Sequence, residues 1–276
     1  MKPAPFEFLR PSTLDEALEA LAADANAKVL AGGQSLIPLL SMRLAAPSML
    51  IDINGLGLDA ITFADDGVRI GALVRHAELE RSDDAARVQP LLREALRLVA
   101  HPTIRNRGTT VGSIVHADAS AEMPAVLCLL GGTVTVSSRT GSRTIAAEDL
   151  YAGPMESTLH HDEVATEAFF PVRQPGTGTA VQEVARRHGD YALCGVAASV
   201  TVADGEVTSA RAAYFSVCEV PTVIDLTGVP SADAGEHALA SLEPQSDIHA
   251  TASYRSQLVR VLTRNVLQAA CDEAFA

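Results

Sequence analysis

The sequence predicts an α+β fold, and three observations support this class. An apolar strand, a glycine turn, a helix and a second strand form a βαβ unit over residues 28–53. Residues 192–202 and 207–217 flank the turn Ala203-Asp204-Gly205-Glu206, which is typical of an antiparallel hairpin. Residues 252–274 have the length and period of one long helix. Parallel and antiparallel strands are therefore expected together with helices in one chain.

Composition limits the class of protein. The chain has 276 residues, of which 47% are hydrophobic and only 4% aromatic, so two modest domains with cores of Ala, Leu and Val are expected. A net charge of −13 argues against binding to nucleic acid. The sequence contains neither a membrane-length apolar run nor a secretory signal, so we expect a cytoplasmic protein.

The four cysteines, Cys128, Cys194, Cys218 and Cys271, are far apart and form no C-x-x-C pair. An iron-sulfur cluster needs several thiolates that converge on one loop. We therefore expect free thiols and no cluster held by this chain.

The sequence of the first half of the chain predicts short helices and strands. Ser12 or Thr13 can cap a helix whose apolar face includes Leu14 and Leu18. The predicted strands are 28–31, 49–53, 68–73, 133–137, 143–146 and 162–170, and the predicted helices that follow the first are 36–44, 76–81, 90–99 and 124–130. His76 is expected on the surface in the first turn of its helix.

The second half begins after a proline- and glycine-rich segment at residues 171–178, which has the composition of a domain linker. The hairpin at 192–217 follows, and then a short helix over 236–242. The long final helix is expected to present one apolar face, made of Tyr254, Leu258, Val261, Leu262 and Ala269.

The first informative stretch connects a strand to a helix through two glycines: Val29, Leu30, Ala31, Gly32, Gly33, Gln34, Ser35 and Leu36. Paired glycines leave no Cβ in the way of a ligand, and the free amides at a helix start favour an anion. This stretch therefore predicts an anion cradle. The alternative is an ordinary strand-to-helix turn.

The second stretch, residues 104–124, is rich in small, hydroxyl and charged residues and predicts a long ordered loop. Its Arg105, Arg107 and His116 are candidates for function, and a solvated surface is the alternative. If both stretches belong to one domain, they can approach one diphosphate from two sides, with hydroxyls supplied by four residues: Ser35, Thr109, Thr110 and Ser113.

Other site classes lack their motifs. The first stretch has neither the Gly-Lys-Ser/Thr ending of a Walker A loop nor the third glycine of the dinucleotide fingerprint. The histidines are scattered, and His160-His161 is interpreted as a polar turn. We therefore name no catalytic and no metal-ligating residue, and any redox chemistry requires a bound cofactor.

Together these stretches resemble a known family. Ala31-Gly32-Gly33-Gln34-Ser35, the segment 105–113 and the segments 116–118 and 122–124 are similar to the FAD-binding medium subunit of the molybdenum hydroxylases, which include xanthine dehydrogenase and carbon monoxide dehydrogenase. The resemblance extends over nearly the whole chain. It also includes Ile70-Gly71-Ala72-Leu73 with His76, the segments 186–192 and 195–198, and Tyr254-Arg255.

The resemblance implies a vanillyl-alcohol-oxidase (PCMH) type FAD-binding domain at residues 1–174, in subdomains of about 1–56 and 57–174. A carbon monoxide dehydrogenase flavoprotein-like domain at 179–276, with an antiparallel sheet and helices, would follow. Non-covalent FAD is implied, with its diphosphate against Val29 to Leu36 and against Thr109, Thr110, Val111, Gly112 and Ser113. Glu122 stands where the family binds the cofactor through an acidic residue. Tyr191 is a candidate for the isoalloxazine environment, and its alternative role is a core aromatic at a strand end.

The resemblance also implies partners. A small subunit would carry 2Fe-2S clusters, a large subunit would carry the molybdopterin cofactor, and the whole would assemble as a dimer of heterotrimers. Electrons would pass from the clusters through FAD to an external acceptor. The sequence identifies neither the substrate oxidised on the large subunit nor the final acceptor, for which NAD, oxygen and a quinone remain open.

One departure from the family concerns Val111. The family commonly has two adjacent glycines in this stretch, and Val111 stands in place of the first. A positive φ there would strain a β-branched residue by about 1–3 kcal/mol. We expect the backbone to tolerate valine. Two alternatives to the electron-transfer subunit remain: a non-enzymatic structural subunit with impaired FAD binding, and a free-standing flavin oxidoreductase.

Overall fold

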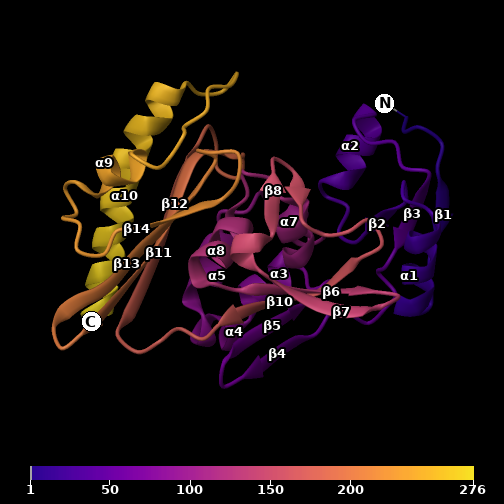
Figure 1. Cartoon of the computed structure of the whole chain (residues 1–276), viewed down its shortest axis with the longest axis horizontal. Helices are drawn as coiled ribbons and strands as arrows, with labels where there is room; N and C mark the ends of the chain where they lie inside the picture. Colours follow the sequence, from indigo (N-terminus) through magenta and orange to yellow (C-terminus); the bar gives the residue numbers. More distant parts are fainter. Residues whose placement is uncertain (1) are drawn as a thin grey trace.

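The computed structural model describes residues 2–276, and Figure 1 shows them as three parts in a row. An N-terminal unit with a small sheet lies at one end. A central part with a five-stranded sheet and most of the helices follows, and a four-stranded sheet with the long C-terminal helix lies at the other end. Parallel and antiparallel sheets occur in the same chain, so the predicted α+β class is confirmed.

The N-terminal unit is a parallel three-stranded sheet with strand order β1-β3-β2. Its strands are β1 (Glu7–Leu9), β2 (Lys28–Leu30) and β3 (Met49–Asp52), and its helices are α1 (Leu14–Ala23) and α2 (Leu36–Met42). Helix α1 starts as predicted, because Thr13 Oγ1 accepts a 3.2 Å hydrogen bond from the amide of Glu16. The predicted βαβ unit is present, whereas β1 is too short to show a period in the sequence.

The central part is built on an antiparallel sheet of order β4-β5-β10-β6-β7. Its strands are β4 (Ile61–Ala64), β5 (Gly67–Gly71), β6 (Thr133–Ser138), β7 (Gly141–Ala146) and β10 (Val164–Pro171), with the small pair β8 (Tyr151–Gly153) and β9 (Glu156–Ser157). The helices are α3 (His76–Arg81), α4 (Asp83–Val88), α5 (Pro90–Leu96), α6 (Pro102–Arg105), α7 (Thr110–His116), α8 (Glu122–Leu130) and the 3₁₀ turn η1 (Ala147–Asp149). These helices and the sheet share one apolar core.

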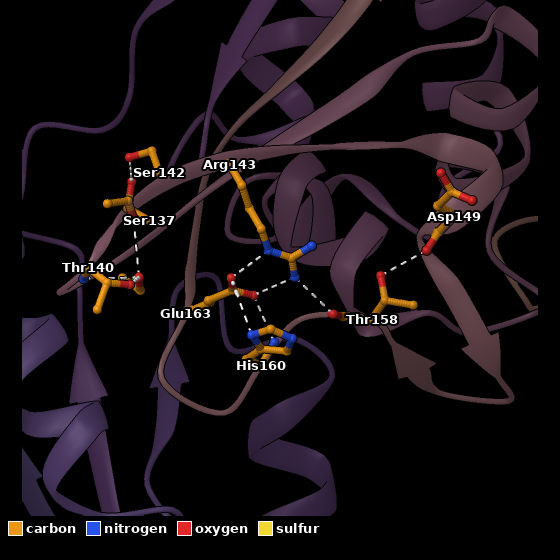
Figure 2. A network of polar contacts seen from close by, with 10 residues as sticks. Ser137, Thr140, Ser142, Arg143, Asp149, Thr158, His160 and Glu163 are labelled. Atoms are coloured by element: carbon orange, nitrogen blue, oxygen red, sulfur yellow. Dashed lines mark hydrogen bonds and ion pairs between the residues drawn. The ribbon is translucent and has the colours of Figure 1, made fainter.

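A polar network fastens the loop that precedes β10 (Figure 2). The guanidinium of Arg143 donates to both carboxylate oxygens of Glu163 at 2.7 and 2.8 Å and to the carbonyl of Thr158 at 3.1 Å. The amide of His160 donates to the same carboxylate at 2.8 Å. His160-His161 thus lies at a turn, where His160 helps to fix the loop.

The C-terminal sheet is antiparallel, with the order β11-β12-β13-β14. Its elements are β11 (Thr177–Ala185), β12 (Ala192–Ala203), β13 (Glu206–Phe215), β14 (Thr222–Asp225), α9 (Ala234–Leu239) and α10 (Ala252–Ala274). The hairpin turn between β12 and β13 has positive φ at Asp204 (53°) and Gly205 (81°), as a type I′ turn requires. The hairpin predicted from these residues is confirmed.

Both faces of this sheet are buried. Alternate residues of one strand point to opposite sides, so each strand contributes to two cores. Ala197 and Phe215 belong to the core that contains α8, whereas Val196, Ala198 and Tyr214 belong to the core beneath α10. The C-terminal sheet therefore lies between α8 and α10, which joins it firmly to the central part (Figure 1).

The bounds of α10 agree with the prediction, and its predicted apolar face is right only in part. Leu262 is buried and Leu258 packs against the same core, whereas Tyr254 is 45% exposed and Ala269 is exposed. The buried positions are Arg255, Val259, Leu262, Thr263, Val266, Leu267 and Ala270. Two of these buried residues are polar, so the buried face of the helix does not appear in the sequence as a regular apolar period. Arg255 donates to the carbonyl of Leu193 at 2.9 Å, and Thr263 pairs with the hydroxyl of Tyr214 at 2.9 Å. Among residues 2–276, no helix combines the length and the apolar content that a membrane span needs.

Candidate functional site

The first glycine stretch forms the turn between β2 and α2, as predicted. Gly33 has a φ of 72°, a conformation that glycine adopts without strain. Gln34 Nε2 donates to the carbonyl of Gly32 at 3.1 Å and holds the turn. Ser35 precedes α2 but makes no side-chain capping bond, so no side chain of the helix start covers its first-turn amides. The amide of Ile37 already donates to the carbonyl of Gly33 at 3.0 Å and Pro38 has no N–H, so the amides of Ser35 and Leu36 are the ones that can donate to an anion.

The second stretch is not the long loop that the sequence predicted. Residues 102–116 contain α6 and α7, and α8 begins at Glu122. Thr109 is the N-cap of α7, since its hydroxyl accepts a 3.2 Å hydrogen bond from the amide of Gly112. Small and β-branched residues hide the helical period here, and burial of Thr110 and Ile114 stabilises the helix instead.

The two glycine stretches lie in direct contact. A Cβ added at Gly32 would lie 2.5 Å from the carbonyl oxygen of Arg107, 2.8 Å from Gly108 Cα and 3.0 Å from the amide nitrogen of Thr109. No side chain fits into that space. A glycine at position 32 is therefore what allows the backbone of the first stretch to approach the start of α7, and the two stretches converge as the sequence analysis expected.

A side-chain clamp holds the two stretches together. Arg75 Nη1 donates to the carbonyl of Arg107 at 2.7 Å, and Arg75 Nη2 donates to Asn54 Oδ1 at 2.6 Å. Asn54 Nδ2 in turn donates to the carbonyl of Ala31 at 2.9 Å and to Asp52 Oδ1 at 2.6 Å. The clamp thus connects Ala31 in the first stretch to Arg107 in the second.

No sequence motif predicted this clamp. Asn54 lies two residues after the end of β3 and Arg75 precedes α3, and neither position belongs to a recognisable motif. The only available signal was the polar pair Asp52 and Asn54 at the end of β3, close in sequence to the first glycine stretch.

His76 was predicted on the surface, and this is wrong. The side chain is 4% exposed, and its Nδ1 lies 3.1 Å from the hydroxyl of Thr110. Burial, assisted by the charge of Arg105, lowers the pKa of His76 to about 4. The ring is therefore neutral at pH 7 and packs against Gly108, where an added Cβ would lie 2.9 Å from His76 Cδ2. His76 is a structural support for the second stretch.

Arg105 and His116 also do not lie on a solvated surface, which was the alternative interpretation of these residues. Arg105 is 8% exposed and forms an ion pair of 2.8 Å with Glu80, so it holds α6 to α3. His116 ends α7 and is half-buried, and burial lowers its pKa. Arg107 alone among the three is exposed, beside the clamp.

Val111 lies in the first turn of α7, where it is 1% exposed. It is not among the non-glycine residues with positive φ in the described chain. The valine therefore adds apolar contact without backbone strain. Gly112 is the constrained position, because a Cβ there would lie 2.5 Å from the hydroxyl of Thr109 and would displace the cap.

Glu122 and Tyr191 lie on opposite sides of the junction between the central part and the C-terminal sheet. Glu122 is the first residue of α8 and is 8% exposed, and burial, then the charge of Glu183, raises its pKa to about 8. Tyr191 is 69% exposed, so its alternative role as a core aromatic is wrong. Partial desolvation and the charges of Asp118 and Glu122 raise the pKa of Tyr191.

A cavity of about 440 Å³ opens beside Tyr191. It is lined by Asp118 and Ser120 from the central part and by residues of the C-terminal part, including Arg187, Ser216 and Arg255. The amide of Ser216 donates to the carbonyl of Ala119 at 2.7 Å, which closes the junction at one side of the cavity. The structure thus places Tyr191 at a hollow between the two parts, where an aromatic ligand could contact it.

The chemistry of the converging stretches fits the diphosphate of FAD. The amides of Thr110, Gly112 and Ser113 at the start of α7 already donate to Val74, to the hydroxyl of Thr109 and to the carbonyl of Thr109. The amide of Val111, the amides at the start of α2 and the hydroxyls of Ser35 and Ser113 are the donors that a pyrophosphate needs, and the glycines let it approach them. Among the described residues, no group of three His, Cys, Asp or Glu side chains is arranged to hold a metal ion.

Two family models match the chain. The model described as the FAD binding domain in molybdopterin dehydrogenase matches residues 4–173, and the model described as the CO dehydrogenase flavoprotein C-terminal domain matches residues 179–270. The first covers more than half of the chain.

Similar proteins agree with both models. The chain is 39% identical to the nicotine 6-hydroxylase medium subunit of Paenarthrobacter nicotinovorans, over 97% of this chain and 98% of that protein. Among solved structures, it is similar to quinoline 2-oxidoreductase from Pseudomonas putida 86, with 36% identity, a TM-score of 0.91 and full coverage of both chains (100% and 100%). It is also similar to carbon monoxide dehydrogenase from Hydrogenophaga pseudoflava, with 32% identity, a TM-score of 0.93 and 98% coverage of each chain.

These matches confirm the resemblance, the α+β fold in which an FAD-binding part precedes a C-terminal sheet and helices, and FAD as the cofactor class. The chain belongs to the FAD-binding medium subunits of the molybdenum hydroxylases.

Proposed function

We propose that this chain holds FAD non-covalently and passes electrons from the iron-sulfur clusters of a small subunit to an external acceptor. The observation that carries the proposal is the contact of Gly32 with Gly108 and Thr109, which forms one cradle out of two amide-rich stretches. Flavin, when bound, supplies the ability to accept electrons singly and to release them as a pair. The chain's own task is to bind, orient and shield it.

We assign the diphosphate to the residues of the two stretches. These are Val29, Leu30, Ala31, Gly32, Gly33, Gln34, Ser35 and Leu36 on one side and Thr109, Thr110, Val111, Gly112 and Ser113 on the other. Backbone amides are the main donors, since Thr109 already uses its hydroxyl to cap α7 and the hydroxyl of Thr110 faces His76. Glu122 and Tyr191 are assigned to the flavin end of the ligand, because Tyr191 lines the cavity at the junction and Glu122 begins α8, four residues after Asp118, which also lines it.

We propose a division into domains at the segment between β10 and β11, with residues 1–174 as the FAD-binding domain and 179–276 as the C-terminal domain. The distribution of the two apolar cores supports this boundary, because the core beneath α10 contains no residue before Ala180.

We propose that the chain works with two partners, a small subunit with 2Fe-2S clusters and a large subunit with the molybdopterin cofactor, in a dimer of heterotrimers. Relatives named as medium subunits or medium chains over their full length support the first part of this proposal. We place the complex in the cytoplasm. The four cysteines are free in the described chain, which suits a reducing compartment.

The structural-subunit alternative loses its motivation, since Val111 is an unstrained, buried helix residue. The free-standing oxidoreductase is tested by co-purification. The chain is expressed together with its two partner chains, and the complex is isolated through a tag on the large subunit. We expect this chain in the complex together with one FAD, identified after heat release. A flavin-loaded chain that never joins the partners would support the free-standing enzyme, and a complex without flavin would support the structural subunit.

A further inference from the structure

Two carboxyl groups at the junction of the central part and the C-terminal sheet lack a basic partner. A buried carboxylate elsewhere in the chain has one, since Glu163 is paired with Arg143. By contrast, Glu122 is 8% exposed and accepts no side-chain hydrogen bond from another described residue. The Oε2 atom of Glu183 is fully buried and has no hydrogen-bond partner in the described chain.

The fold brings these two groups together from different parts of the chain. Glu122 begins α8, and Glu183 lies on β11 opposite Gly195 of β12, the strand on which α8 packs. The side of Gly195 that would carry a Cβ is filled by the ring of Phe215. Glu183 is therefore held at the junction by a neighbour that offers it no polar group.

The other ionisable groups around the pair do not neutralise it. Asp118 and Tyr191, which interact with Glu122, are themselves acidic groups and supply no positive charge. The charged groups on the elements packed against α8 and β11 act elsewhere. His116 on α7 interacts with Asp118, and Arg211 on β13 acts on Cys128. Glu94 on α5 interacts with Glu273 of α10, which accepts a hydrogen bond from the amide of Thr179 on β11. The pair is an uncompensated acidic site.

Ionising both carboxyl groups in a desolvated site costs free energy, because each charge is poorly solvated and the two charges repel each other. Burial, together with the charge of Glu183, raises the pKa of Glu122 to about 8, and burial raises the pKa of Glu183 to about 7. Near pH 7.5 the two groups together consequently hold roughly one proton.

We propose that Glu183 is a further positioning residue of the flavin site, and that Glu122 and Glu183, which lack a basic partner in the described chain, complete their hydrogen bonds only when FAD is bound. The inference rests on the proposed function. Hydroxyl and N–H groups of FAD donate to carboxylate oxygens, and hydrogen bonds to the ionised form favour that form. Binding therefore breaks the O–H bond of a carboxyl group that is protonated before FAD binds, and the proton leaves to solvent.

The test measures proton release when FAD binds to the full-length apo chain. Calorimetric titrations at about pH 7.5 in two buffers of different ionisation enthalpy give the number of protons released. We expect roughly half to one proton per FAD for the wild type and a clearly smaller number for Glu183→Gln, which removes one carboxyl group and its charge on the other. We also expect FAD affinity to rise about tenfold to hundredfold from pH 6.5 to 8.5 in the wild type, and by less in Glu183→Gln. Glu206→Gln, at an exposed carboxyl group on β13, is the matched control and should behave as wild type.

A second measurement needs no flavin. A carboxyl group with a raised pKa binds its proton more tightly in the folded state, so its stabilising effect is complete below about pH 4.5 and is lost as pH rises to about 8. Urea unfolding of the apo chain should show this loss in the wild type and a shallower one in Glu183→Gln. FAD binding with the same proton release in both proteins overturns the inference alone, whereas a wild-type chain that binds no FAD overturns the proposed function.

Discussion

Arg75 Nη2 lies 2.6 Å from Asn54 Oδ1, and this hydrogen bond joins the N-terminal sheet to the start of α7. The other end of the same guanidinium holds the carbonyl of Arg107. The first stretch belongs to the N-terminal sheet and its helix α2 and the second to helices of the central part, so their spacing depends on this bridge as well as on packing. Burial and the nearby charge of Arg107 lower the pKa of Arg75, yet the group stays charged at any pH at which the protein is folded.

Arg75→Met should weaken FAD binding. Loss of a charged hydrogen bond costs about 1.5–3 kcal/mol, so we expect a roughly tenfold to hundredfold higher Kd for FAD. Fluorescence titration of the apo chain measures it. Arg81→Met, at the exposed end of α3, is the control and should leave the Kd unchanged. Equal affinity in Arg75→Met and wild type would show that the clamp does not position the cradle.

Gly32→Ala should separate the two stretches. The added methyl group would lie 2.5 Å from the carbonyl of Arg107, so the backbone has to move before both stretches can bind one diphosphate. We expect the variant to fold and to be purified with less than about a tenth of the wild-type flavin. Gly55→Ala is matched to it, since its Cβ would meet only Arg10 at 3.7 Å. Full flavin occupancy in Gly32→Ala would contradict the proposed approach of the two stretches.

His76 should make the fold sensitive to acid. Its pKa is lowered to about 4 in the folded state, so between pH 6.5 and 4 the unfolded chain binds more protons, and stability falls as pH decreases. The full effect amounts to at most about 3 kcal/mol. Unfolding free energies at pH 7 and 5 should differ less in His76→Gln than in the wild type. An identical pH dependence in both proteins would mean that His76 is not buried as a neutral ring.

Val111→Gly should destabilise the chain without improving FAD binding. The variant loses a fully buried side chain and gains a helix-weakening residue, for a total of about 2–4 kcal/mol. Val111→Ala separates the two contributions, because it removes the methyl groups and keeps helix propensity. Tighter FAD binding by the glycine variant than by the wild type would show that valine does strain this turn.

The sequence could predict the elements with a clear local signal. The glycine turn after β2, the cap at Thr13, the Asp204-Gly205 turn and the bounds of α10 each depend on neighbouring residues, and each is present. Helix α7 escaped prediction because its stability comes from burial of Val111 and Ile114 in a core assembled from distant segments.

The candidate site was predictable as two separate stretches but not as an assembly. Gly32 and Gly33 are visible as a turn, whereas the reason for glycine at position 32, the carbonyl of Arg107, lies 75 residues further along the chain. His76 was misplaced for the same reason, since its polar partner Thr110 comes from another helix. The face of α10 was misplaced in part because Arg255 and Thr263 are buried with polar partners that only the folded chain supplies.

The most direct test of the central claim compares ligands that differ in the diphosphate. The apo chain is titrated with FAD, FMN and riboflavin while the flavin absorbance and fluorescence are followed. We predict one FAD per chain and an affinity for riboflavin that is weaker by at least about a hundredfold, because riboflavin leaves the amides of both stretches unpaired. Equal affinity for FAD and riboflavin, or no binding of FAD, would contradict the claim that Gly32 and Thr109 form a diphosphate cradle.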